Sequence, residues 1–90
     1  MKTVYRDITV INKNGLHTRP SAQFAKTAIK FKSEIFIEME EKRVNGKSVM
    51  GLITLEAEFG KTMHVTTIGE DAEELMDAVE DVIKNFVAED

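Results

Sequence analysis

Hydrophobic residues along this chain follow two different periods, and each period predicts a type of secondary structure. Where apolar and polar residues alternate, as in residues 34–39, every second side chain faces the same way and a half-buried strand is predicted. Where apolar residues recur at three- and four-residue spacing, as in residues 18–29, an amphipathic helix is predicted. In chain order the predicted elements are strand 4–11, helix 18–29, strand 34–39, strand 43–45, helix 48–55, strand 61–68 and a last helix that begins at Glu70 or Asp71.

Turn residues locate the ends of several of these elements. The Glu-Glu-Lys segment at 40–42 separates two strands and is predicted to form a hairpin turn, although its residues are poor turn formers. The Asn-Gly pair at 45–46 is the strongest short hairpin signal, but residues 48–51 after it do not alternate like a strand. We therefore predict that residues 45–47 lead into the short helix, with Ser48 as its N-cap.

The order of elements predicts the fold class. A βαββαβα order, with helices that each carry one apolar face, is typical of an α+β domain, here spanning residues 1–90. We expect a four-stranded, largely antiparallel sheet with the helices on one face. The predicted core residues are Val4, Ile8, Val10, Ile35, Ile37, Met39, Met63 and Val65 from the strands and Leu75, Met76, Val79, Val82, Ile83 and Phe86 from the last helix.

Composition limits the classes of function. A chain of 90 residues makes one domain with a single modest core. The net charge of −4 argues against bulk nucleic-acid binding, which needs a basic field. The absence of cysteine excludes disulfides, thiolate metal sites and cysteine nucleophiles, and it is compatible with a reducing compartment. Because there is also no signal-peptide core and no long apolar run, we expect a cytoplasmic protein without membrane insertion.

The segment Gly-Leu-His-Thr-Arg-Pro at residues 15–20 places a histidine where an anion-binding site is expected. Pro20 suits the first turn of a helix, so His17 should lie at or just before the helix N-terminus, beside unpaired N–H groups and the positive end of the dipole. Arg19 adds a guanidinium that can bind a phosphate through two parallel hydrogen bonds. Neutral imidazole is a nucleophile at cellular pH. We therefore predict that His17 accepts a phosphoryl group and that Arg19 stabilises it.

Each candidate residue also has a simpler interpretation. A lone histidine before a helix usually carries no chemistry, Arg19 by itself is more often a solvated helix residue, and Ser48 is a common N-cap whatever the function. His64 lies on the polar side of its strand and is predicted to be exposed without a chemical role. Two histidines and scattered carboxylates do not form a metal-ligand spacing, so we expect neither a metal site nor a cofactor.

Residues 15–20, together with Lys-Ser-Val-Met-Gly at residues 47–51, resemble HPr, the histidine-containing phosphocarrier of the bacterial phosphoenolpyruvate-dependent phosphotransferase system. The resemblance runs the full chain, and both motifs fall at the family's spacing. It implies an open-faced β-sandwich, phosphorylation of His17 at Nδ1 by phosphorylated enzyme I, and transfer to the IIA domain of a sugar permease. It also implies a stoichiometric carrier rather than an enzyme, a monomer, and, in Gram-positive-type members, phosphorylation of the residue matching Ser48 by HPr kinase/phosphorylase.

The resemblance further implies a docking surface around the histidine. Met50 is expected to stand exposed beside the His17 loop, with Phe24 or Ala22 nearby, because a soft methionine suits a surface used by several partners. A transcriptional regulator is a further partner that the resemblance allows. The residues expected to contact partners are Thr18, Pro20, Ala22, Gln23, Phe24, Lys26, Val49, Met50, Gly51 and Leu52.

Departures from the family pattern leave alternatives open. Thr18 and the Gln-Phe pair at 23–24 are similar to proteobacterial HPr, residues 48–51 are similar to the kinase-regulated type, and Ser21 stands where alanine is common. An HPr-like regulatory paralogue of the nitrogen-type branch is therefore the alternative function. An acylphosphatase-type enzyme would need a glycine-rich phosphate loop, an RNA-binding module a basic face with aromatic strands, and a metal carrier a cysteine pair; the sequence offers none of these.

Overall fold

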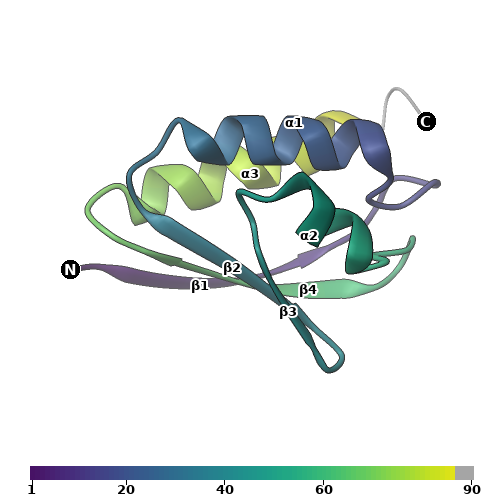
Figure 1. The fold of residues 1–90 in the computed structure, drawn as a ribbon, viewed down its shortest axis with the longest axis horizontal. Coiled ribbons are helices and arrows are strands. Elements are labelled where there is room, and N and C mark those ends of the chain that lie inside the picture. Colours follow the sequence, from purple (N-terminus) through teal and green to yellow (C-terminus); the bar gives the residue numbers. More distant parts are fainter. Residues whose placement is uncertain (87–90) are drawn as a thin grey trace.

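The protein is built from one sheet covered on one face by three helices. The computed structural model describes residues 1–86 of the chain. Figure 1 shows α1 and α3 lying side by side above the sheet, with the shorter α2 beside them and the opposite face of the sheet open. The predicted α+β class, element order and one-sided helix layer are confirmed. The elements are β1 Thr3–Thr9, α1 Thr18–Ile29, β2 Glu34–Met39, β3 Lys42–Asn45, α2 Val49–Thr54, β4 Thr62–Ile68 and α3 Ala72–Asn85.

The sheet has the strand order β1-β4-β2-β3, and every neighbouring pair is antiparallel. β4 is the last strand in the sequence but lies in the middle, so Thr66 pairs with Tyr5 on one side and with Phe36 on the other. This crossover brings the segment after β1 beside the segment before β4. The carbonyl of Val10 accepts a hydrogen bond from the N–H of Gly60, with an N···O distance of 2.9 Å. The loop that carries His17 therefore rests on the loop that follows α2.

Several predicted boundaries differ from the structure by one or two residues. β1 ends at Thr9 rather than residue 11, because the chain leaves the regular ladder as it enters the loop toward α1. The hairpin turn has two residues rather than three, so Lys42 already belongs to β3 and pairs with Met39. Glu40 takes the left-handed conformation that this tight turn requires, with a φ of 58°. Val4 is also only half-buried, contrary to the prediction.

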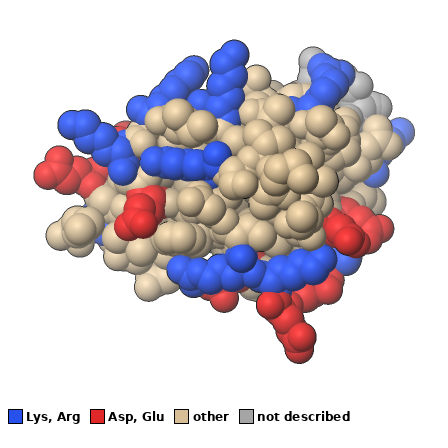
Figure 2. Space-filling view, in the orientation of Figure 1, with Lys and Arg blue, Asp and Glu red and all other residues tan. Residues whose placement is uncertain are grey.

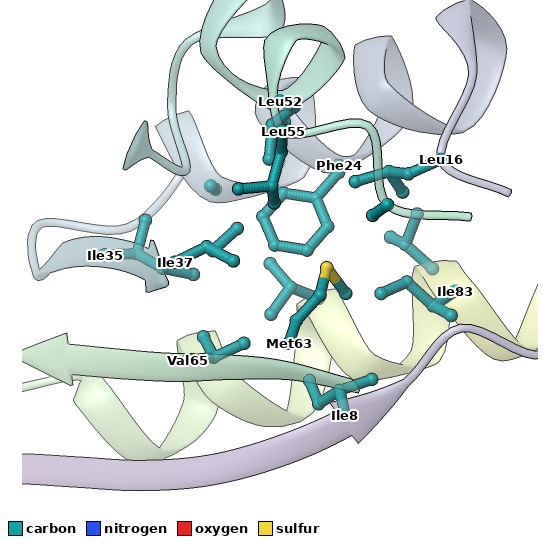
Figure 3. Close-up of a cluster of buried hydrophobic side chains, with 14 of the residues drawn as sticks. Ile8, Leu16, Phe24, Ile35, Ile37, Leu52, Leu55, Met63, Val65 and Ile83 are labelled. Atoms are coloured by element: carbon teal, nitrogen blue, oxygen red, sulfur yellow. The ribbon is translucent and has the colours of Figure 1, made fainter. Parts of the chain in front are cut away.

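The core lies between the inner face of the sheet and the helices (Figure 3). Alternation in the strands places Ile8, Ile37 and Met63 on this face, as predicted. Phe24 from α1 and Leu52 from α2 point down onto them, and all five of these side chains are at most 4% exposed. Because these side chains come from helices far apart in sequence, core packing fixes α2 against α1.

The segment between β3 and α2 leads into the helix, as predicted. Gly46 packs so closely that a Cβ atom there would lie 2.9 Å from Cγ2 of Ile35. Close packing, rather than a hairpin turn, therefore requires glycine at this position. The Oγ atom of Ser48 accepts a hydrogen bond from the N–H of Gly51 at 3.0 Å. Ser48 is therefore the N-cap of α2.

Charged side chains fasten α3 to the rest of the fold. The guanidinium of Arg6 on β1 contacts Asp77, Glu80 and Glu73 of α3 at N···O distances of 2.8, 2.9 and 3.2 Å. These carboxylates raise the pKa of Arg6, foremost through the hydrogen bond with Asp77.

The start of α3 is held by a second polar contact. The carboxylate of Asp71 accepts hydrogen bonds from the hydroxyl and N–H of Ser33 and from the N–H of Lys32. These bonds favour the charged form, and the Ser33 hydroxyl contributes most, so the pKa of Asp71 is lowered from 3.8 to about 2. The loop before β2 and the loop before α3 are thereby joined.

Candidate functional site

His17 is the N-cap residue of α1, where the sequence places it. Its backbone is extended, with φ of −76° and ψ of −167°, and its side chain is exposed. Within the described chain the imidazole makes no capping hydrogen bond to α1, so it does not occupy the first-turn N–H groups. The first turn also carries no acidic residue. An anion attached to this ring would therefore lie near the positive end of the helix without competition from a carboxylate of that turn.

The peptide group between Gly15 and Leu16 is held at both of its polar ends. The side-chain Nδ2 of Asn12 donates to the carbonyl of Gly15 at 2.6 Å, and the N–H of Leu16 donates to the carbonyl of Ala57 at 2.8 Å. Gly15 has a φ of 68°, and a Cβ atom there would lie 2.6 Å from the Ala57 carbonyl oxygen. Only glycine fits this close approach two residues before His17.

The next peptide group is held as well. Ser21 is buried and its Oγ donates to the carbonyl of Leu16 at 2.9 Å, while its N–H donates to the carbonyl of His17 at 3.0 Å. Neither Asn12 nor Ser21 was predicted to belong to the site. A signal for Ser21 was present, because it precedes Phe24 by three residues and therefore shares the apolar face of α1. No comparable signal pointed to Asn12.

A hollow of about 330 Å³ lies beside the imidazole. Leu16 and Ala57 contribute apolar surface to it, and Ile53 brings α2 to its edge, so the structure places α2 next to the His17 loop as expected. The carboxylates of Glu56 and Glu58 also border the hollow. This acidic border was not foreseen from the sequence, since the two segments are some forty residues apart and meet only through the crossover of the sheet.

Arg19 lies in the first turn of α1, but its guanidinium is directed toward the C-terminal end of α3. The guanidinium carbon lies over the ring of Phe86, 5.7 Å from the ring centroid. Arg19 and Phe86 border a second hollow, separate from the one beside His17. Stacking on an aromatic ring restrains the side chain and leaves the guanidinium charged.

The docking residues implied by the resemblance divide into exposed and buried members. Met50 is 68% exposed, as expected, and it lies beside the half-buried Val49 on α2. Phe24 and Leu52 are fully buried and Pro20 is buried, so the expectation that these three side chains contact a partner is wrong. They face the core because helical spacing puts them on the inner sides of α1 and α2. The exposed members on α1 are Thr18, Ala22, Gln23 and Lys26, and Gly51 on α2 is half-exposed.

The charge of the chain is divided between two regions. Residues 8–33, which include the His17 loop and α1, carry five Lys or Arg side chains and no Asp or Glu, although the whole chain has a net charge of −4. Figure 2 shows basic side chains along the edge of the molecule formed by α1 and an uncharged area over α2. The surface around His17 is therefore basic along α1 and uncharged over α2, and the carboxylates of Glu56 and Glu58 border the hollow between them. The net charge alone does not show this division.

Three other observations bear on the candidate function. His64 is exposed on the open face of the sheet, where its Nδ1 lies 2.7 Å from a carboxylate oxygen of Asp7. Among residues 1–86, no group of three or more His, Asp or Glu side chains is arranged to hold a metal ion. None of the described helices is long and apolar enough to cross a membrane.

Comparison with known proteins gives consistent matches over nearly the whole chain. A family model described as "PTS HPr component phosphorylation site" matches residues 4–85. The chain is 44% identical over 84 residues to the phosphocarrier protein HPr of Neisseria meningitidis serogroup B, covering 93% of this chain and 94% of that protein. Its structure is similar to that of HPr-C-His from Thermoanaerobacter tengcongensis, with a TM-score of 0.87, 41% identity and coverage of 100% and 99% of the two chains.

A further solved structure bears on the oligomeric state. An HPr dimer from Thermoanaerobacter tengcongensis matches with a TM-score of 0.74 and 41% identity, covering 97% of this chain and 98% of that chain. Because this relative is a dimer, the expectation of a monomer does not follow from the resemblance.

Proposed function

This chain belongs to the HPr family of phosphocarrier proteins, and we propose that it carries a phosphoryl group on His17. The observation that supports the proposal best is the position of His17 as the exposed N-cap of α1, with no acidic residue in the first turn. A phosphoryl group on the ring would gain from the helix dipole by about 0.3–1 kcal/mol, and up to about 2 kcal/mol when partly buried. This modest gain suits a carrier, since tight retention would oppose onward transfer.

The proposed transfer needs no second nucleophile on this chain. The lone pair of Nδ1 of His17 attacks phosphorus, and the Nδ1–P bond forms as the donor's bond to phosphorus breaks and its electron pair stays with the donor. In the onward step the acceptor attacks the same phosphorus, and the Nδ1–P electron pair returns to the imidazole, which leaves readily once the ring is protonated. Phosphoryl transfer depends mainly on positioning and charge stabilisation, which the partner proteins can complete.

We assign the stabilisation of the transferring phosphate to Arg19. Its guanidinium is two residues from His17, and its stacking on Phe86 restrains it without removing its charge. Arg19→Ala should slow transfer about tenfold or more while the melting temperature stays nearly unchanged. Arg43→Ala is a matched control, because Arg43 also stacks on an aromatic ring, Phe36 at 4.5 Å, but lies on β3. A large drop in melting temperature with normal transfer would instead make Arg19 structural.

The proposed partners are phosphorylated enzyme I as donor and the IIA domain of a sugar permease as acceptor. The basic residues of α1 and the exposed apolar side chain of Met50 support a docking surface on either side of His17. A partner that is apolar at its centre and acidic around it fits this arrangement. The remaining candidates of this surface are Thr18, Ala22, Gln23, Lys26, Val49 and Gly51.

We further propose that phosphorylation of Ser48 by an HPr kinase/phosphorylase regulates docking. Ser48 caps α2, and the next two residues, Val49 and Met50, belong to the proposed docking surface. A phosphate there adds about −1.5 to −2 charges at neutral pH. A helix N-terminus accepts that charge, whereas an acidic partner is repelled by it.

The assignment of His17 is tested by phosphorylation in vitro. The protein is incubated with enzyme I and phosphoenolpyruvate, and its intact mass is measured with and without hydroxylamine. We expect one phosphoryl group that is removed by acid and by hydroxylamine. His17→Ala should abolish the adduct, and His64→Ala, which removes the other exposed histidine, should leave it intact. Equal labelling of His17→Ala and the parent protein would contradict the proposal.

A further inference from the structure

The side chain of Asn12 is buried at the base of the His17 loop, and only one end of its amide is used. It is 1% exposed, its Nδ2 donates to the carbonyl of Gly15, and its Oδ1 has no hydrogen-bond partner within residues 1–86. A buried acceptor without a partner lowers stability. A small apolar residue would avoid this loss, so a contribution to overall stability does not account well for an asparagine at this position.

The backbone bonds around Asn12 suggest what it does. Its own carbonyl accepts the N–H of Gly15 at 3.0 Å, so both polar groups of Gly15 are held by one residue. The carbonyl of Gly15 and the N–H of Leu16 belong to a single peptide group. This Leu16 N–H donates to the carbonyl of Ala57 at 2.8 Å. Fixing both ends of a peptide group prevents its rotation. The orientation of the chain that enters His17 is therefore set from both sides.

The following peptide group is restrained at its carbonyl end. Its carbonyl, that of Leu16, accepts the hydroxyl of Ser21, which is fully buried. Two consecutive peptide groups before His17 thus depend on the side chains of Asn12 and Ser21. Both side chains are covered by protein, so neither can touch a phosphoryl group or a partner.

We propose that Asn12, assisted by Ser21, is a positioning residue that presets the imidazole of His17 for in-line attack. The inference rests on the proposed role of His17. A side chain follows its backbone, and a rotation of the preceding peptide moves the nucleophilic nitrogen away from the line of attack. Small misplacements of a reacting atom reduce rates strongly, and rigid supporting residues prevent them. The docking surface is unchanged by this positioning, so the effect falls on the transfer step rather than on binding.

The experiment compares Asn12→Ala and Ser21→Ala with Thr67→Ala as a matched control. Thr67 is also fully buried, and its hydroxyl also donates to a backbone carbonyl, that of Ala72 at 2.8 Å, but it lies at the far end of β4. Initial rates of phosphorylation by enzyme I are measured over a range of carrier concentrations. We expect Asn12→Ala to lower kcat about tenfold with KM changed less than twofold, and Ser21→Ala to lower kcat by a smaller factor. Thr67→Ala should leave both constants near those of the parent.

A second readout does not require phosphorylation. Amide hydrogen exchange of Leu16 and the side-chain couplings of His17 are measured by NMR in the same variants. Asn12→Ala should exchange the Leu16 N–H at least tenfold faster and average the His17 side chain over several rotamers, and Thr67→Ala should do neither. Unchanged exchange and couplings in both Asn12→Ala and Ser21→Ala would overturn the inference. A parent protein that is not phosphorylated, but whose variants loosen His17, would instead overturn the proposed function and leave the positioning intact.

Discussion

Ser48 allows the effect of charge on docking to be separated from the effect on folding. The perturbation is a set of three substitutions: alanine removes the cap, asparagine keeps a neutral cap, and aspartate keeps a charged one. In the structure the Oγ of Ser48 accepts the N–H of Gly51 at 3.0 Å. Losing such a cap costs about 1 kcal/mol, which corresponds to a fall of roughly 4–8 °C in melting temperature for a domain of this size. Ser48→Ala should therefore melt lower, whereas Ser48→Asn and Ser48→Asp should melt near the parent.

The expected effect on docking follows from Coulomb's law. A negative charge at Ser48 faces solvent, because the residue is only half-buried at the N-terminus of α2. A carboxylate of the partner about 8 Å away is then repelled by about 0.5 kcal/mol in the dielectric of water, which is about twofold in affinity. Two such carboxylates raise KM about fivefold for Ser48→Asp, and the larger charge of a phosphate raises it further. The neutral Ser48→Asn should leave KM unchanged.

The assay measures KM and kcat for phosphorylation by enzyme I, together with melting temperatures, at low and high salt. Repulsion between exposed charges is screened by salt, so the difference between Ser48→Asp and Ser48→Asn should shrink as the salt concentration rises. Equal KM values for these two variants at low salt would refute the electrostatic switch and leave Ser48 as a helix cap. A raised KM in Ser48→Ala as well would show that the cap, rather than the charge, matters for docking.

Three further predictions concern stability. Arg6→Met removes three ion pairs between β1 and α3, each worth about 0.2–1 kcal/mol, so it should lower the free energy of unfolding by about 0.6–3 kcal/mol. A loss below about 0.5 kcal/mol in urea denaturation would contradict this. The pKa of Asp71 is lowered to about 2, so its stabilisation is complete above about pH 4 and is lost as the pH falls toward 2. Asp71→Asn should therefore have a lower free energy of unfolding than the parent at pH 6 and lose less of it when the pH is lowered toward 2. An equal shift of the urea midpoint in both proteins on acidification would refute this. Gly15→Ala should lower the free energy of unfolding by at least about 1 kcal/mol more than Gly60→Ala. Both glycines have a positive φ, but of the two only Gly15 lacks room for a Cβ atom. Equal losses in urea denaturation would contradict this and mean that the loop adjusts.

The candidate site could be predicted from the sequence only where local signals define it. The N-cap position of His17 follows from Pro20 and the apolar spacing behind it, and both are local features. The assignment of Phe24 and Leu52 to a docking surface is wrong because proximity to a motif does not reveal which face of a helix is covered. Their exposure depends on how α1 and α2 pack together over the sheet. For Phe24 the helical spacing did predict burial, since Phe24 shares a face of α1 with the buried Ala28.

The contacts that hold the loop before His17 could not be predicted from local sequence patterns. Asn12 lies three residues before Gly15 in sequence, but its importance depends on its burial and on the partner of the Leu16 N–H. That partner, Ala57, is brought to the loop by the pairing of β4 with β1. The acidic border of the hollow beside His17 arises from the same pairing. Such contacts join distant segments, and no period of hydrophobic residues describes them.

The sequence by itself determined the kinds and order of the elements, the helix-start position of the histidine and the identity of the cap at Ser48. These features depend on side-chain periodicity and on hydrogen bonds within a few residues, so short stretches of the sequence are enough to specify them. The tertiary structure alone decided the strand order, which of the predicted contact residues are accessible, and how the peptide groups before His17 are held. These depend on which distant segments meet, and that is set by the collective burial of apolar side chains against one face of the sheet.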